Sequence, residues 1–79
     1  MTPLSNITGR QIKKFVESIG YKYVRQRGSH LRFKHSFKAS ITIPAIGKKV
    51  VKSGLLKGLL NTMEVDVKLF YDYLNYNNI

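Results

Sequence analysis

An alternating stretch near the middle of the chain constrains the fold most strongly. This stretch is the run His-Leu-Arg-Phe-Lys that begins at His30, in which polar and apolar side chains alternate. Successive side chains of a β-strand point to opposite faces, which predicts that Leu31 and Phe33 face a core. His30, Arg32 and Lys34 then share the other face. The stretch predicts a sheet with one buried face and one polar face, the latter holding an imidazole beside two cations.

The flanking segments predict two further strands. Residues 21–26 contain two tyrosines and a valine, which favour strands. Gly28 can adopt a positive φ, so Arg27 and Gly28 are the predicted turn into the next strand. A second turn at 36–38 leads to a third strand over 39–43, whose isoleucines face the core. Strands joined by such short connections are antiparallel.

Helical patterns stand on both sides of these strands. Thr8 and Gln11 have the spacing of a capping box, and the apolar residues that follow recur at helical intervals. Gly20 lies where a left-handed C-terminal cap belongs. Towards the C-terminus, residues 45–52 are predicted to form a loop, and Ser53 to cap a leucine-rich helix.

Two residues affect the stability and the start of the C-terminal helices. Gly58 lies inside the leucine-rich helix and costs about 1 kcal/mol relative to alanine unless it allows close packing. Asp66 is the predicted N-cap of a last helix that runs from Val67 to about Tyr76. The expected order is therefore α-β-β-β-α-α, in one α+β domain over residues 1–79. Its three-stranded antiparallel sheet carries helices on one face and leaves the other open.

Charge and composition limit the classes of partner. Fourteen Lys and Arg against four Asp and Glu give a formal net charge of +10, which implies a polyanionic partner, usually nucleic acid, with solubility or a basic proteome as the alternative. Cysteine is absent, which excludes disulfides and thiolate zinc sites and suits a reducing cytoplasm. No apolar run is long enough to span a membrane, and the N-terminus lacks the pattern of a signal peptide. We therefore expect a cytoplasmic protein without a membrane partner.

The available chemistry is that of imidazole, cations and hydroxyls. The acidic residues form no predicted pair or cluster, and His30 and His35 have opposite parity, so neither a metal nor another cofactor is expected. Cleavage of RNA by its own 2′-hydroxyl needs only proton transfer, for which histidine is suited, and positive charge near the phosphate. Arg32 and Lys34 can stabilise that charge, and Ser29 and Gly28 can offer a hydroxyl or backbone N–H. From the residues alone, a plain surface histidine remains the commoner reading of His30.

Further contacts to RNA have weaker patterns. Arg27 in the predicted turn and the Lys48-Lys49 pair in the later loop are candidate phosphate contacts, although the lysines could simply solvate the loop. Tyr21 and Tyr23 are candidates for base stacking, with burial in the core as the alternative. His35 is expected to have a structural role.

Several of these residues also occur together in a known family. The run Arg-Gln-Arg-Gly-Ser-His that ends at His30, with Gly20-Tyr21 before it and Ile43-Pro44 after it, resembles the HicA toxins of HicA–HicB toxin–antitoxin systems. The likeness continues through the Gly-Leu-Leu-Lys-Gly-Leu-Leu run at 54–60. It extends roughly from residue 8 to residue 70.

This resemblance implies a fold and a function. It implies a double-stranded-RNA-binding-domain-like fold and a metal-independent endoribonuclease that cleaves mRNA, with His30 in the position of the catalytic histidine. It also implies a HicB-like antitoxin as partner, which covers the His30 face and through which the protein could oligomerise. Ile46 stands where family members often have a second histidine, which favours the alternative of a non-catalytic RNA-binding module on the same fold. A third reading is an interaction protein whose basic face docks another protein.

Overall fold

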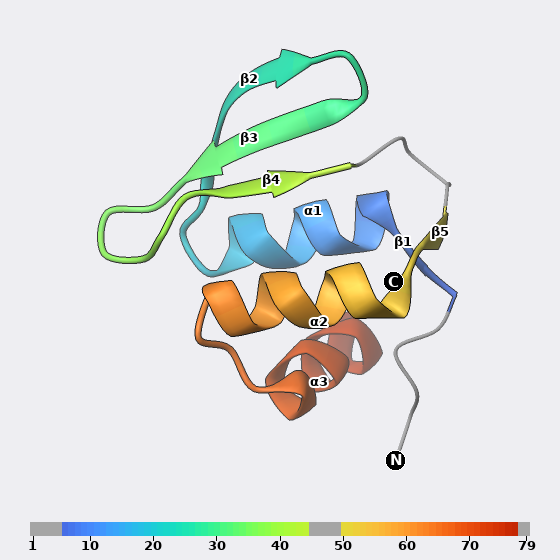
Figure 1. Ribbon diagram of the computed structural model, residues 1–79. Coiled ribbons are helices and arrows are strands. Elements are labelled where there is room, and N and C mark those ends of the chain that lie inside the picture. The colour runs from blue at the N-terminus through green and yellow to red at the C-terminus, as the bar shows by residue number, and fades with distance from the viewer. Residues whose placement is uncertain (1–5, 45–49, 78–79) are drawn as a thin grey trace.

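A sheet and a layer of helices form the protein (Figure 1). The computed structural model describes residues 6–44 and 50–77. The elements in chain order are β1 (Ile7–Thr8), α1 (Gly9–Ser18), β2 (Lys22–Arg27), β3 (His30–Lys34), β4 (Ile41–Ile43), β5 (Val50–Val51), α2 (Ser53–Thr62) and α3 (Val67–Asn77). Strands β2, β3 and β4 form an antiparallel sheet in that order. All three helices lie on one side of this sheet, which confirms the predicted α+β class (Figure 1).

The core lies between the two layers. Phe33 and Ile43 enter it from the sheet, Phe15 from α1, Leu60 from α2 and Phe70 from α3, and all five are essentially inaccessible to solvent. The Phe15 and Phe70 rings meet edge to face with centroids 5.0 Å apart, a favourable aromatic geometry. Strand β3 alternates between exposed and buried residues as predicted, so its outer face is left to polar side chains.

Both predicted ends of α1 are confirmed. Thr8 N–H donates to Gln11 Oε1 over 2.8 Å, and Gln11 N–H donates to Thr8 Oγ1 over 3.3 Å, which completes a capping box. Gly20 follows the helix with a φ of +103°. A Cβ at this position would lie 2.9 Å from His35 Nε2, so the close approach of His35 also requires glycine here.

The segment after β4 differs from prediction at two places. Val50–Val51 forms a short strand, β5, which pairs antiparallel with β1, whereas the whole of 45–52 was expected to be a loop. A two-residue strand is too short to leave an alternating pattern in the sequence. Lys52, not Ser53, is the N-cap of α2, and no side chain caps that end. The Asp66 cap of α3 is confirmed, because Asp66 Oδ1 accepts from Lys68 N–H over 2.9 Å.

His35 anchors the connection between β3 and β4. Its Nε2 lies 2.8 Å from the carbonyl oxygen of Ile19, and its Nδ1 accepts the backbone N–H groups of Phe37 and Lys38 over 3.0 and 3.2 Å. This set of partners requires the neutral tautomer with hydrogen on Nε2. The imidazole therefore ties the end of α1 to the β3–β4 loop, a structural role as predicted.

Tyr21 and Lys38 anchor the same loop. The Tyr21 hydroxyl donates to the carbonyl oxygen of Ala39 over 2.7 Å, and Lys38 Nζ donates to the carbonyl oxygen of Met63 at the end of α2 over 2.8 Å. Burial, with a smaller contribution from the Glu64 carboxylate, raises the pKa of Tyr21, which keeps the phenol protonated as a donor. The β3–β4 loop is thus held at several points.

Removing the His35 anchor should destabilise the fold. The substitution His35→Ala deletes three hydrogen bonds, so we expect the free energy of unfolding to fall by about 1–3 kcal/mol. Urea denaturation monitored by circular dichroism would measure it. Ser36→Ala, in the same loop but exposed and outside the anchor, is the matched control and should change stability by less than about 0.5 kcal/mol. Equal stability of the two variants would contradict the anchoring role.

Gly58 offers a gain in stability. A Cβ at this position in α2 would have no atom within 4 Å, so close packing does not explain the glycine. We expect Gly58→Ala to raise the free energy of unfolding by about 1 kcal/mol through helix propensity. A thermal melt that shows no increase in Tm over the parent protein would contradict this expectation.

Candidate functional site

A tight hairpin carries the candidate site. Strands β2 and β3 are joined by the two residues Gly28 and Ser29, and Arg27 pairs directly with His30 across the turn. The turn was predicted one residue earlier, at Arg27 and Gly28. Gly28 has a φ of +60° at the first turn position, where a type II′ hairpin turn requires glycine. This geometry places His30 at the very start of β3.

A β-bulge in β2 decides which side chains join His30. The paired residues are Lys22 with Lys34, Tyr23 with Phe33, Arg25 with Arg32, Gln26 with Leu31, and Arg27 with His30. Val24 is the extra residue at the register shift. Directly paired residues of an antiparallel sheet point to the same face, so the bulge sends Tyr23 and Arg25 to opposite faces although they are two residues apart. Arg25 therefore lies on the His30 face.

The residues on this face line a shallow pocket of about 200 Å³. Its lining residues are Arg25, Arg27, His30, Arg32 and Thr42. Arg32 Nη1 donates to Thr42 Oγ1 on β4 over 3.1 Å, which holds that guanidinium across the sheet. The His30 ring is exposed and has no hydrogen-bonding partner within residues 6–44 and 50–77, so both of its nitrogens can meet a ligand.

The pocket contains part of the predicted site. Arg27 and Arg32 line it with His30, and Gly28 and Ser29 form the adjoining turn. Lys34 lies on the same face but outside the pocket, opposite Lys22. The predicted contacts Lys48 and Lys49, together with Ile46, lie outside the described residues.

Arg25 and Thr42 were missing from the predicted site. The strand parity of Thr42 places it on the polar face, so only its approach to Arg32 was unforeseen. The sequence carries no comparable signal for Arg25, because its facing depends on the bulge at Val24.

The aromatic candidates do not lie on this face. Tyr21 is buried in the core, as the alternative reading had it. Tyr23 is 51% exposed, but it points to the Phe33 side of the sheet and meets the Phe33 ring edge-on with centroids 6.0 Å apart. Neither ring can therefore stack on a base bound beside His30.

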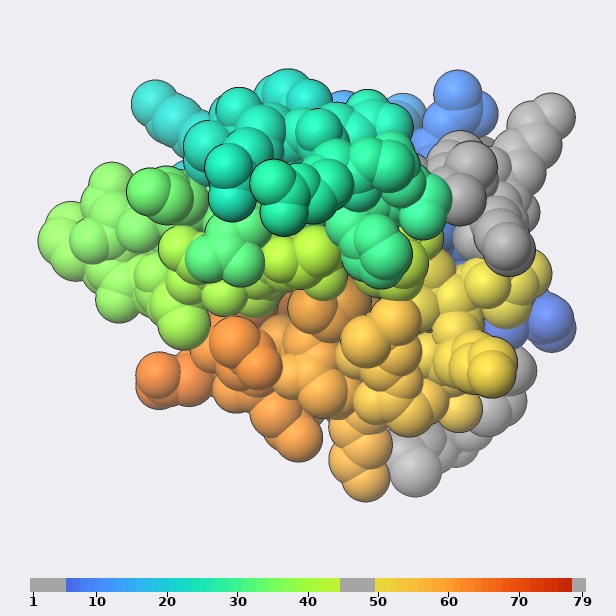
Figure 2. All heavy atoms as spheres, turned by 45° about the horizontal axis from the view of Figure 1, so that its top comes forward, coloured from blue at the N-terminus to red at the C-terminus, as the bar shows by residue number. Residues whose placement is uncertain are grey.

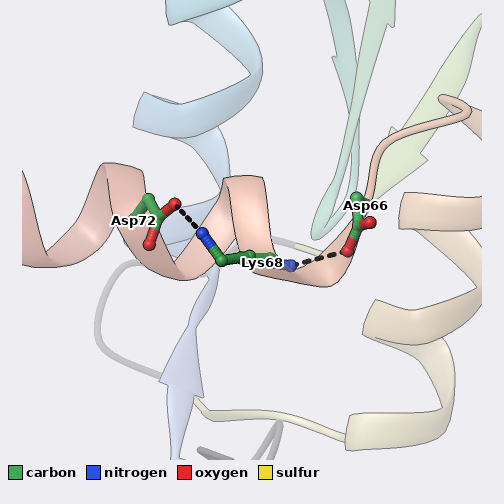
Figure 3. A network of polar contacts seen from close by, with 3 residues as sticks. All are labelled: Asp66, Lys68 and Asp72. Carbon is green, nitrogen blue, oxygen red and sulfur yellow. Dashed lines mark hydrogen bonds and ion pairs between the residues drawn. The ribbon is translucent and has the colours of Figure 1, made fainter.

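Positive charge on the sheet face is not compensated by carboxylates. Strands β2, β3 and β4 contain no Asp or Glu, and the hairpin side chains gather on the upper surface of the molecule, coloured teal and green in Figure 2. Three of the four acids have partners elsewhere: Glu17 pairs with Lys13 over 3.3 Å, and Asp66 and Asp72 both contact Lys68 of α3 (Figure 3). The face with His30 therefore presents only cations and neutral groups.

Like charges also stand directly opposite each other on this face. Lys22 faces Lys34 and Arg25 faces Arg32, arrangements that destabilise a sheet when no anion lies between them. The sheet thus carries a repulsion that a bound polyanion would relieve.

Reversing one of these charges should stabilise the free protein. We expect Lys22→Glu, which would face Lys34, to raise the free energy of unfolding by about 0.2–1 kcal/mol. Lys57→Glu, at an exposed position of α2, changes the net charge equally without a cross-strand partner and is the control. Chemical denaturation at low salt would measure both variants, and an equal or smaller gain for Lys22→Glu would contradict cross-strand repulsion.

None of the helices among the described residues is long and apolar enough to cross a membrane.

Comparisons with known proteins place the chain in a family. Searches of curated proteins and of solved structures found no match. A family model described as the HicA toxin of bacterial toxin–antitoxin systems matches residues 9–65, from the start of α1 through the hairpin to just beyond α2. This match covers most of the chain and the whole of the pocket, so the chain belongs to the HicA toxin family.

Proposed function

We propose that this protein is an endoribonuclease toxin that cleaves mRNA, with His30 as its catalytic residue. The observation that carries the proposal is the pocket in which an exposed imidazole lies among three arginines on a face without carboxylates. Membership of the HicA toxin family supports it, because the family resemblance implies a ribonuclease whose catalytic histidine stands at position 30.

The reaction requires two proton transfers at one phosphate. The 2′-oxygen of the RNA attacks phosphorus while its proton passes to a base, and the bond from phosphorus to the 5′-oxygen breaks as that oxygen gains a proton. The products end in a 2′,3′-cyclic phosphate and a 5′-hydroxyl. An imidazole can perform either transfer near neutral pH. His30 is assigned one of them, with the other left to a lysine or water.

The arginines of the pocket are suited to the phosphate. A guanidinium can donate two parallel hydrogen bonds to phosphate oxygens, and its charge stabilises the negative charge that builds up in the transition state. Arg32 is held by Thr42 before RNA binds, so less conformational freedom is lost on binding. Arg25 and Arg27 approach the same pocket from β2.

The same surface supports neutralisation by a HicB-like antitoxin. We infer that the antitoxin covers the His30 face and offers carboxylates to it, since a net charge of +10 favours an acidic partner. Such a partner would occupy the cations that bind RNA.

A non-catalytic RNA-binding module on this fold is the second candidate. The observation that favours it is the His30 ring itself, which no hydrogen bond orients among the described residues, whereas catalytic imidazoles are usually held by a partner. Ile46, in place of a family histidine, points the same way. This candidate binds RNA with a marked salt dependence and does not cut it.

The two candidates differ in the effect of His30→Ala on RNA cleavage. We expect the parent protein to cleave RNA in excess EDTA and the variant to be slower by about 10²–10⁴-fold, the usual contribution of general acid–base catalysis. Gel analysis would follow the cleavage, and mass spectrometry would identify the cyclic phosphate end. Tyr76→Ala, on α3, is the control for purification and should cleave like the parent. Equal cleavage by parent and His30→Ala would contradict the assignment, and binding without cleavage by both would favour the RNA-binding module.

A further inference from the structure

A second cation pair extends the basic face beyond the pocket. Lys22 and Lys34 stand directly opposite each other at the end of the hairpin away from the turn, and neither lines the pocket. The outward pairs thus follow one another along the hairpin: Arg27 with His30, Arg25 with Arg32, and Lys22 with Lys34. We call these three pairs the cation track. The sheet face that carries it has no carboxylate to occupy its charges.

The dimensions of the cation track suit one nucleic acid strand. Successive outward residues of a strand are about 6.7 Å apart, a spacing comparable with that of phosphates along an extended single strand. Each pair is narrow, because the Cβ atoms of directly opposed residues are only about 4.5–5.5 Å apart. A single row of phosphates can therefore lie over the track.

An exposed aromatic ring lies near the Lys22–Lys34 end of the track. Phe37 is 93% exposed, and it follows Lys34 by three residues, so its Cα is within about 11 Å of the Lys34 Cα. Its backbone is fixed, because its N–H donates to His35 Nδ1 over 3.0 Å, and its ring tilts against the His35 ring with centroids 6.2 Å apart. A side chain this exposed buries little apolar surface, and its ring presents a flat face to solvent. Single-strand binding proteins combine such rings with a basic groove.

We propose that single-stranded RNA lies along the cation track and stacks one of its bases on Phe37. This inference rests on the proposed function, since the track begins at the pocket where His30 would cut. The turn at Gly28 and Ser29 ends the hairpin just beyond His30. The track therefore contacts the RNA on one side of the scissile phosphate, and Phe37 stacks on a base on that same side.

Binding of an uncleavable RNA tests this inference. A fluorescent single-stranded oligonucleotide with 2′-O-methyl groups throughout has no 2′-hydroxyl to attack, so its affinity can be measured by anisotropy with the active protein. We expect Phe37→Ala to weaken binding by about 5- to 100-fold, and Phe37→Leu by nearly as much, because stacking needs a flat ring. Tyr76→Ala, which removes an aromatic ring that is 90% exposed on α3, should leave the affinity unchanged.

Salt dependence tests the lysine pair separately. We expect Lys22→Ala to reduce the slope of log affinity against log salt by about 0.7, the value for one lost phosphate contact with a single strand. Lys57→Ala removes a cation from an exposed position of α2 and should keep the parent slope. The oligonucleotide can also be shortened one nucleotide at a time. Removing nucleotides from one end should abolish the difference in affinity between the parent protein and Phe37→Ala, whereas removing them from the other end should leave that difference in place.

Several outcomes would overturn the inference. It fails if Phe37→Ala binds RNA as tightly as Tyr76→Ala, or if a duplex of the same sequence binds as tightly as the single strand. If Phe37→Ala keeps its RNA affinity and instead loses affinity for a purified HicB-like antitoxin, the ring is a protein contact and the inference is wrong. The readout does not depend on cleavage. If RNA binding depends on Phe37 but the protein cuts no RNA, the proposed function is wrong and the inference of a single-strand binding track is still supported.

Discussion

Burial of one face of β3 is the constraint on which the rest of the structure depends. Phe33 is inaccessible to solvent beneath the sheet, and Leu31 shares its face, so the helices must lie on that side. Because side chains alternate along a strand, the same residues that build the core leave His30, Arg32 and Lys34 on the opposite face. The hydrophobic effect that folds the chain thus also exposes its basic groups together.

Segregation of charge follows from the two-layer design. The acids among the described residues lie outside the sheet: Glu17 and Asp72 make ion pairs within helices, Asp66 caps α3, and Glu64 lies between α2 and α3. The sheet face keeps only cations and neutral groups. This arrangement costs stability, since like charges stand opposite each other across β2 and β3. A polyanion bound on this face would relieve that repulsion.

The two histidines of the chain lie in very different surroundings. His35 makes three hydrogen bonds, and they fix its tautomer and join α1 to the β3–β4 loop. His30 makes none with the described residues and faces solvent among arginines. The first stabilises the fold, and the second is left exposed on the polar face of the sheet. Their different parity on and after β3 separates these roles.

The sequence by itself determined the class of fold, the capping of α1, the facing of β3 and the prominence of His30, because these depend on local periodicity and on single residues with strong preferences. Only the tertiary structure decided the rest. The bulge at Val24 places Arg25 on the same face as His30, and β1 pairs with β5, which lies far from it in the sequence. Neither is visible in a local pattern, since a bulge reverses parity without changing composition and a two-residue strand is stabilised by its distant partner rather than by its own propensity.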